Sequence, residues 1–501
     1  MRALDLAVIL AYAIAITVFG VRFYRRAGSA TAFMVAGRRL PAVVVGLSIF
    51  ATYLSSISFL ALPGKAYAAD WSPFAFSLSL PLAAFVAARW FVPLYRATED
   101  VSAYAYLERR FGMWARLYAA SFYLLTQVAR VATILFLVAL ALEPLTGWNV
   151  VTIIVVTGLL VTVYVAAGGV EAAIWTDVVQ GVILTLGTLT CALVLLAGMP
   201  GGPAALIALA DAHGKFALGS FDPAPYTANF WVVFVYGMVI NLQNFGIDQS
   251  YVQRYQTARS LAAARRSLWL GALTYMPVSA LFLFIGTALY AYYSAQPQLL
   301  PEALRTTEAA DRIFPYFIVS QLPAGVTGLV IAALLAAAQS TLSTSINSSA
   351  TVIATDFYRR LLRPQCAEGA QLRVLRAMSV ALGLIGTGAA LLMISIKSTL
   401  DAWWNLAGIF SGGMLGLFLL GALSRRAGSV QAGLGMVLGL LVLAWAALSP
   451  QLAVAWANPF HAFMTTVMGT LTIFLVGMVL SRRRARRVAT AGEPAATIHD
   501  I

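Results

Sequence analysis

The hydrophobic positions of this chain fall into long apolar runs that are separated by short polar segments. Each run is close to the roughly 20 residues that a helix needs to cross a bilayer. Thirteen runs are found, at 5–24, 42–64, 74–95, 117–144, 149–167, 173–198, 229–250, 267–292, 322–352, 373–395, 402–422, 429–448 and 460–480. The pattern predicts an all-α polytopic membrane protein with thirteen transmembrane helices.

Two of these runs are interrupted near the middle by polar residues and helix breakers. The second run contains three serines and a Pro–Gly pair within LSSISFLALPGKAY (54–67), and the seventh contains NLQNFG (241–246). Broken hydrophobic segments at matching positions of two halves are typical of the central site of an inverted-repeat transporter. Ordinary helix packing through small residues is the alternative for either segment alone.

The ninth run carries an unusual number of hydroxyl groups, in AAAQSTLSTSINSSAT (336–351). At helical spacing they form two adjacent faces: Ser340, Ser343, Thr344 and Asn347 on one, and Thr341, Ser345 and Ser348 on the other. Hydroxyl and carbonyl oxygens are hard ligands that suit alkali cations. We therefore expect a sodium ion between this helix and backbone carbonyls freed by unwinding near residues 51–58. Hydrogen bonding of each hydroxyl to the carbonyl four residues earlier is the alternative.

Two ionisable residues lie within apolar runs, where charge is costly. Asp177 lies near the start of the sixth run, where it could cap the helix or ligate a cation. Arg130 lies in the middle of the fourth run, and we find no obvious acidic partner for it in the sequence. Since a guanidinium matches a carboxylate in shape and charge, we expect a substrate carboxylate there, with a structural ion pair as the alternative.

Composition agrees with a membrane protein, because 61% of residues are hydrophobic, 10% are charged, and the mean hydropathy is +0.84. The net charge of +14 does not indicate nucleic-acid binding, since the basic residues cluster between the apolar runs. Twenty-five Lys and Arg residues fall on one predicted side and six on the other. The positive-inside rule then predicts a multi-pass protein of the cell (inner) membrane, with the N-terminus outside and the C-terminus in the cytoplasm.

The polar residues do not indicate an enzyme. The three histidines (His213, His461 and His499) lie in loops, at a span edge or in the tail, and no HExxH motif is present. We expect one transmembrane transporter domain over 1–487 and a disordered cytoplasmic tail over 488–501. The expected partners are the lipid bilayer, sodium and a small solute; no nucleic acid is expected and no oligomer is required.

Five motifs together resemble the sodium:solute symporter family. They are FMVAGRRLP (33–41), LSSISFLALPGKAYAADW (54–71), TDVVQGVIL (176–184), DQSYVQRY (248–255) and AAAQSTLSTSINSSATVIATDFY (336–358). The resemblance implies a LeuT-like five-plus-five inverted repeat, with a broken first helix in each repeat. The repeats span about 42–198 and 229–422, and the helices 5–24, 429–448 and 460–480 are peripheral.

The resemblance also implies the ion sites. The first sodium site comprises the carbonyls of Ala51, Leu54 and Ala337 with the side chains of Ser340 and Thr341. A second sodium site, present in some family members, matches Asp177, Ser340, Ser343 and Thr344. We therefore expect one or two coupled sodium ions.

The motifs are most similar to those of bacterial sialic acid and other organic anion symporters. There an arginine matching Arg130 holds the carboxylate, and hydroxyls matching Ser55 and Ser58 hydrogen-bond it. A glutamine that contacts the sugar falls at Ser77 here, which is too short for that contact. The candidate substrate-binding residues are Arg130, Ser55, Ser58, Tyr53, Ser77, Gln243 and Asn244.

The expected function is secondary active, sodium-coupled uptake of a small carboxylate-bearing solute, sialic acid or another organic anion, by alternating access. Two alternatives stay open. One is sodium-coupled uptake of a neutral solute or an amino acid, such as a sugar or proline. The other is proton-coupled transport through Asp177.

Overall fold

The computed structural model describes residues 2–54, 56–98, 100–306, 309–394, 412–452 and 456–490. Within these ranges the chain forms helices joined by loops, with one isolated β-bridge between Leu40 and Ala258. Ten of the described helical segments are long and apolar enough to cross a membrane, and eleven if one bent helix pair is counted as a span. The all-helical, membrane-spanning architecture predicted from the apolar runs is therefore confirmed.

The helices that correspond to the apolar runs follow the chain in order. They are α1 (Ala3–Val21), α3 (Ala42–Tyr53), α4 (Ser56–Ala68), α5 (Phe74–Leu78), α6 (Leu80–Val86), α7 (Val92–Thr98), α9 (Met113–Thr146), α10 (Val150–Gly198), α12 (Phe230–Ile247), α13 (Gln249–Gln256), α14 (Leu261–Ala295), α16 (Val326–Val352), α17 (Glu368–Met393), α19 (Met414–Leu423), α20 (Ser429–Leu448) and α21 (Met464–Thr490). Shorter helices lie between them: α2 (Ala30–Val35), α8 (Ala105–Phe111), α11 (Gly202–Ala212), α15 (Ala310–Ser320) and the π-helical segments η3 (Ala87–Phe91) and η7 (Ile353–Leu362).

Helix α10 contains two of the predicted runs, 149–167 and 173–198. Its 49 residues correspond to a length of about 73 Å at 1.5 Å per residue, more than twice the roughly 30 Å of a hydrocarbon core. The helix is kinked at Gly169, whose φ of 58° and ψ of −148° lie outside the helical region. A Cβ there would lie 2.6 Å from the carbonyl oxygen of Phe33, so the kink requires glycine.

Both runs that the sequence marks as interrupted are broken in the structure. In the second run, α3 ends at Tyr53, Leu54 is extended (φ −78°, ψ 99°), and α4 is bent by 56° relative to α3. In the seventh run, α12 continues as a regular helix through Ile247, and the break lies at Asp248 (φ −72°, ψ 119°). The predicted break at 241–246 is thus wrong in position, because the aspartate caps the next helix by accepting a hydrogen bond from the Ser250 amide.

Loops that the charge count assigns to one side of the membrane contact one another. On what we term the arginine-rich side, the contacts are Leu40–Thr257, Val101–Gln249, Glu108–Arg360 and Ala27–Arg376. On the opposite side, they are Arg2–Leu322, Tyr67–Lys215 and Gly198–Gln296. In each of these contacts, the two segments are ones that the charge count places on the same side of the membrane.

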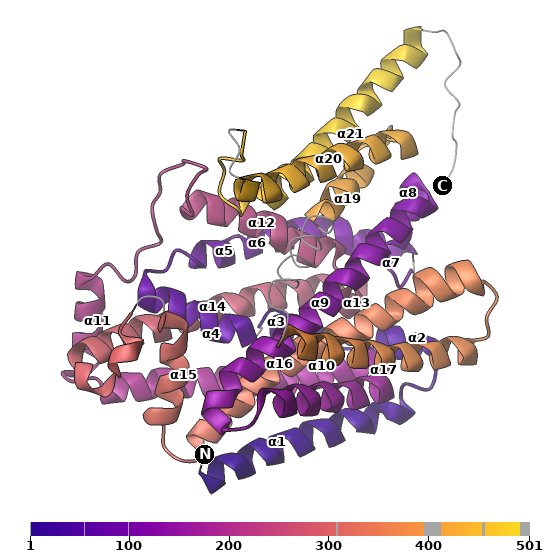
Figure 1. The fold of residues 1–501 in the computed structure, drawn as a ribbon. Helices are drawn as coiled ribbons and strands as arrows, with labels where there is room; N and C mark the ends of the chain where they lie inside the picture. Colours follow the sequence, from indigo (N-terminus) through magenta and orange to yellow (C-terminus); the bar gives the residue numbers. More distant parts are fainter. Residues whose placement is uncertain are drawn as a thin grey trace.

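Helix α16 lies inside the bundle, and the first and last helices lie at its periphery. The most apolar window of the segment Val326–Leu362 is 89% buried, against 28% for α1 and 28% for α20. Figure 1 shows α1 along one side of the bundle and α20 with α21 on the opposite side. Of the predicted run 402–422, only its end is described, as part of α19, and 395–411 lies outside the described residues.

Candidate ion and solute site

The hydroxyl face of α16 meets the carboxylate of Asp177 inside the bundle. Ser340 donates a hydrogen bond to one carboxylate oxygen (2.7 Å), and Ser48 of α3 donates to the other (2.6 Å). All three side chains are buried. Because Ser48 and Ser340 bind the two oxygens of one carboxylate, helices α3, α10 and α16 converge at this point.

A guanidinium lies in the same cluster. Arg254 of α13 donates to Asp177 (2.7 Å), to the Ser48 hydroxyl (2.8 Å) and to the hydroxyl of Thr344. The side chains of Arg254 and Asp177 are 3% and 0% exposed, so this is a buried ion pair. Asp177 lies inside continuous helix and uses its carboxylate on other helices, so the capping interpretation is wrong. Arg254 follows the seventh apolar run in the sequence, but it lies on α13, a helix whose residues are buried.

Of the residues expected at the second sodium site, Ser340 bonds Asp177 directly, and Thr344 is linked to it through Arg254. Ser343 and Thr344 also donate to the backbone carbonyl of Ser340, at 3.0 and 2.6 Å. These bonds within one helix are the alternative that the sequence left open. The oxygen atoms of these residues are ligands that suit sodium. A sodium ion at this position would share the carboxylate of Asp177 with the positively charged Arg254.

The residues expected at the first sodium site lie further along α3, at Ala51 and at its C-cap Leu54, and around Ser340 on α16. Ala51 lies one turn after Ser48, close to Gly181 of α10, where an added Cβ would be 3.3 Å from the Ala51 Cβ. Thr341 donates to the carbonyl of Ala337 at 3.2 Å, and Leu54 supplies the extended residue at the break. Helices α3 and α16, which carry these residues, contact each other.

Arg130 lies inside the bundle, against the break in the seventh run. It hydrogen-bonds the side chain of Tyr251 and is attracted electrostatically by Asp248. Among the described residues, no carboxylate lies within 4.0 Å of its guanidinium. The sequence offered no obvious acidic partner for Arg130, and the structure adds Asp248, at the chain break, as the carboxylate that attracts it. An ion pair at contact distance is not formed.

Tyr53 connects the two broken spans. Its hydroxyl donates to the Asn241 amide oxygen at 3.0 Å and accepts from Asn244 at 3.2 Å. Its ring lies 5.1–5.2 Å from the rings of Phe245, Tyr251 and Tyr275. The sequence places Tyr53 and Asn244 in separate spans, and the structure brings them into direct contact.

The remaining candidate substrate residues are Ser58, Ser77, Ser55 and Gln243. Ser58 shares a hydrogen bond with Tyr275, which also bonds Ser279, and Ser279 bonds Ser77 at 2.8 Å. Ser55 lies outside the described residues. Gln243 lines a cavity of about 30 Å³, which is room for one water, and its buried amide oxygen has no hydrogen-bond partner within the described part of the chain.

A larger cavity lies on the side opposite the arginine-rich loops. It has a volume of about 920 Å³ and lies between α4, α9 and α15, with Leu137, Ala141 and Asp311 among its lining residues. Leu137 is seven residues after Arg130 on α9. The two side chains therefore lie on one face of the helix, about 10 Å apart along its axis. Arg130 itself does not line this cavity.

Several residues of the site were not among the sequence candidates. They are Ser48, Arg254, Asp248, Tyr251 and Tyr275. The signal available in the sequence was DQSYVQRY (248–255), a polar segment directly after an apolar run, all of whose residues after Asp248 are buried in the structure.

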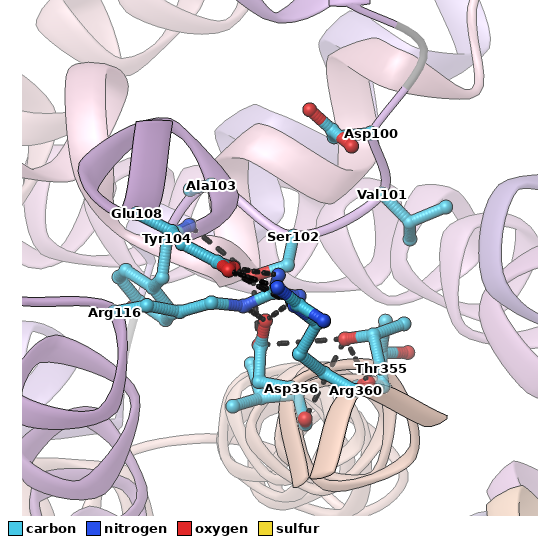
Figure 2. Close-up of polar contacts among 12 residues, drawn as sticks. Asp100, Val101, Ser102, Ala103, Tyr104, Glu108, Arg116, Thr355, Asp356 and Arg360 are labelled. Atoms are coloured by element: carbon cyan, nitrogen blue, oxygen red, sulfur yellow. Dashed lines mark hydrogen bonds and ion pairs between the residues drawn. The ribbon is translucent and has the colours of Figure 1, made fainter. Parts of the chain in front are cut away.

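A second buried charged cluster lies on the arginine-rich side (Figure 2). Arg116 of α9 binds Asp356 of η7 through two nitrogens, one of them at 2.6 Å, and Glu108 of α8 at 2.7 Å. Ser102 donates to Asp356, and Arg360 donates to Glu108 at 2.5 and 2.9 Å. Hydrogen bonds from Arg360 and then from Arg116 hold the pKa of Glu108 below its usual range.

A broken span that meets a hydroxyl-bearing helix inside the bundle is typical of an ion-coupled secondary transporter. The chain belongs to the sodium:solute symporter family, whose model matches residues 33–439. It is therefore a membrane transporter and not an enzyme.

Two curated relatives match nearly the whole chain. The sodium/sialic acid symporter NanT of Aliivibrio fischeri is 35% identical over 95% of this chain and 92% of its own length. The sodium/sialic acid symporter SiaT of Proteus mirabilis is 33% identical over 95% and 94%. A solved sodium-coupled sialic acid symporter in a substrate-bound, outward-open state superposes with a TM-score of 0.89 at 30% identity, covering 96% of this chain and 98% of its own.

Proposed function

We propose that this protein couples inward sodium movement to the uptake of a small carboxylate-bearing solute, with sialic acid as the first candidate. The observation that carries the proposal is Arg130, a partly buried guanidinium within a membrane span and near a chain break, with no ion pair at contact distance in the described residues. A substrate carboxylate supplies the missing anion. The sialic acid symporters that resemble this chain support that choice of solute.

The proposed ion site lies where α3, α10 and α16 converge. The first sodium ion binds the carbonyls of Ala51, Leu54 and Ala337 with the hydroxyls of Ser340 and Thr341. Sodium there would fix the break in the second span against α16, and this ordering would raise the affinity for the solute. A reciprocal coupling of about 1–3 kcal/mol is typical of such linkage.

A second sodium ion is proposed at Asp177, with Ser340, Ser343 and Thr344. It would share the carboxylate with Arg254, so its affinity depends on how far that guanidinium withdraws from Asp177. With two sodium ions and one anion, each cycle moves net positive charge inward. The membrane potential then contributes about 2.3 kcal/mol per charge per 100 mV.

The proposed solute site comprises Arg130 with the hydroxyls of Ser55 and Ser58 and with Tyr53, Ser77, Gln243 and Asn244. Ser77 hydrogen-bonds Ser279 and is short, so solutes that need a long polar contact at this position should bind weakly.

The proposed topology has thirteen transmembrane helices, the N-terminus outside and the C-terminus in the cytoplasm. Two inverted repeats cover 42–198 and 229–422, and the broken pairs α3/α4 and α12/α13 are their first helices. The peripheral position of α1, α20 and α21 supports this division (Figure 1). The proposed transporter domain covers residues 1–487; of the predicted tail 488–501, residues 488–490 continue α21 and residues 491–501 lie outside the described residues.

Uptake into proteoliposomes tests the proposal. Labelled sialic acid should accumulate under an inward sodium gradient, faster with an inside-negative potential, and should not accumulate when choline replaces sodium at constant pH. Uptake that persists in choline would favour proton coupling through Asp177. Accumulation of a neutral sugar or proline in place of acids would favour the neutral-solute alternative.

Arg130→Ala separates the two roles of the arginine. We expect it to abolish uptake of acids while leaving stabilisation by sodium in a thermal-shift assay intact. Arg89→Ala is the matched control, because Arg89 also lies within a span but is exposed, with its guanidinium over the ring of Trp90. Unchanged acid transport in Arg130→Ala would refute the proposed role.

A further inference from the structure

Tyr12, on the peripheral helix α1, reaches a buried amide network on α16. Its hydroxyl donates to the amide oxygen of Gln339 at 2.7 Å. Gln180 of α10 donates to the same oxygen at 3.3 Å and to the Tyr12 hydroxyl at 3.4 Å. Tyr12 is 8% exposed, and the two glutamines are each 1% exposed, so the three polar groups bond one another in an otherwise apolar contact.

This network lies directly beside the ion cluster. Gln339 is the residue before Ser340, whose hydroxyl binds Asp177, and Gln180 is one turn after Asp177 on α10. Because adjacent helical residues are fixed relative to one another, the rotation of α16 at Gln339 also sets the direction of the Ser340 hydroxyl. A bond from α1 thus constrains a helix that bears two of the proposed ligand hydroxyls.

Helix α1 is itself fixed against α16 at a second point. The carboxylate of Asp5 accepts hydrogen bonds from the backbone amides of Gly325 (2.7 Å) and Gly328 (3.0 Å) at the start of α16. These amides belong to the helix end, whose N–H groups have no partner within the helix. A Cβ at Gly328 would lie 2.6 Å from the Asp5 carbonyl, so the two helices are in close contact there. Because Asp5 binds the start of α16, the position of α1 along α16 is fixed, and Tyr12 lies where its hydroxyl reaches Gln339.

We propose that Tyr12 is a positioning residue for sodium: its hydrogen bond to Gln339 holds α16 in the rotation that directs Ser340 and Thr341 toward the ion. This inference rests on the proposed function, since it assigns a determinant of sodium affinity at the same site. It gives the peripheral helix α1, which lies outside both proposed repeats, a role in ion binding.

Tyr12→Phe tests the proposal, because it removes the hydroxyl and keeps the ring. The sodium concentration for half-maximal thermal stabilisation of the purified protein should rise by about three- to tenfold, the range expected for one neutral hydrogen bond. In uptake assays the half-saturating sodium concentration should rise to the same extent, while the solute KM at saturating sodium stays unchanged. A purely structural role would lower the stability without this split.

Tyr292→Phe is the matched control, since Tyr292 also donates to a glutamine oxygen, that of Gln321 at 3.3 Å, away from the ion cluster. It should leave the sodium titration unchanged. Gln339→Met, which also removes the bond from Gln180, should shift the titration at least as far as Tyr12→Phe, and the double variant should shift no further than Gln339→Met, because both changes remove the Tyr12–Gln339 bond.

The outcomes separate the two proposals. If the unsubstituted protein shows no stabilisation by sodium over choline, the proposed function fails. If it titrates with sodium and both Tyr12→Phe and Gln339→Met match it within twofold, the positioning role is refuted. If Tyr12→Phe does not fold, the Gln339→Met titration decides alone.

Discussion

The buried pair of Arg116 and Asp356 on the arginine-rich side offers a quantitative test of how charges stabilise this bundle. Asp356→Asn removes the negative charge with little change in volume. Arg116, whose side chain is 10% exposed, then keeps its charge with Glu108 as its remaining carboxylate partner. The substitution therefore leaves a largely buried cation only partly compensated.

The expected magnitude follows from the burial of both partners. Removing one member of a buried ion pair typically costs about 3–5 kcal/mol, since the other charge has lost its compensation. Because Glu108 remains bound to Arg116, we expect a loss at the lower end, about 3 kcal/mol in the free energy of unfolding. The exposed pair of Asp100 and Arg109, with side chains 32% and 44% exposed, should contribute about 0–1 kcal/mol.

The assay is reversible unfolding of the purified protein in mixed micelles, followed by fluorescence, for Asp356→Asn and for the control Asp100→Asn. A double variant, Arg116→Met with Asp356→Leu, should recover much of the loss, because no buried charge is left without a partner. Equal effects of Asp356→Asn and Asp100→Asn would refute the reasoning. So would a double variant as unstable as the two single variants added together.

Three further predictions concern other elements. Asp177→Asn should destabilise the sodium-free protein by about 3–5 kcal/mol, since it leaves the buried guanidinium of Arg254 unpaired. Reversal-potential measurements on this variant should show one coupled sodium ion. Two coupled ions would exclude the Asp177 carboxylate as a sodium ligand. Arg360 holds the pKa of Glu108 low in the folded protein. The ionised Glu108 therefore stabilises the fold at pH values above the pKa that Glu108 has in the unfolded chain, and this stabilisation is lost as the pH falls through the pKa of Glu108 in the folded protein. The stability difference from Glu108→Gln should therefore be constant above about pH 5 and shrink below about pH 4. Gly169→Ala should destabilise the protein by at least about 1 kcal/mol, because residue 169 has a positive φ and its Cβ would lie against the carbonyl oxygen of Phe33. Gly388→Ala is the control, since a Cβ at residue 388 meets open space. Equal stabilities of the two variants would contradict the need for glycine at the kink.

The sequence predicted which parts of the chain cross the membrane and which of them are unusual. Transfer of apolar side chains into lipid is a local property, so each run can be recognised without its neighbours. The helical period of the hydroxyls around Ser340 is local in the same sense. The position of the second break was less predictable, because the polar residues at 241–246 are accommodated by partners such as Tyr53 and Ser79 and remain helical.

The tertiary structure decided how the charges are matched. Asp177 is 77 residues from Arg254 and 129 residues from Ser48 in the chain, and no periodicity relates them. A buried charge needs a partner, but the sequence does not say which one, because that depends on where α3, α10, α13 and α16 converge. The chain alone therefore determined the spans, the hydroxyl face and the need for counter-charges. Packing alone determined that Arg254 pairs with Asp177, while Arg130 has no carboxylate at contact distance among the residues that the structure describes.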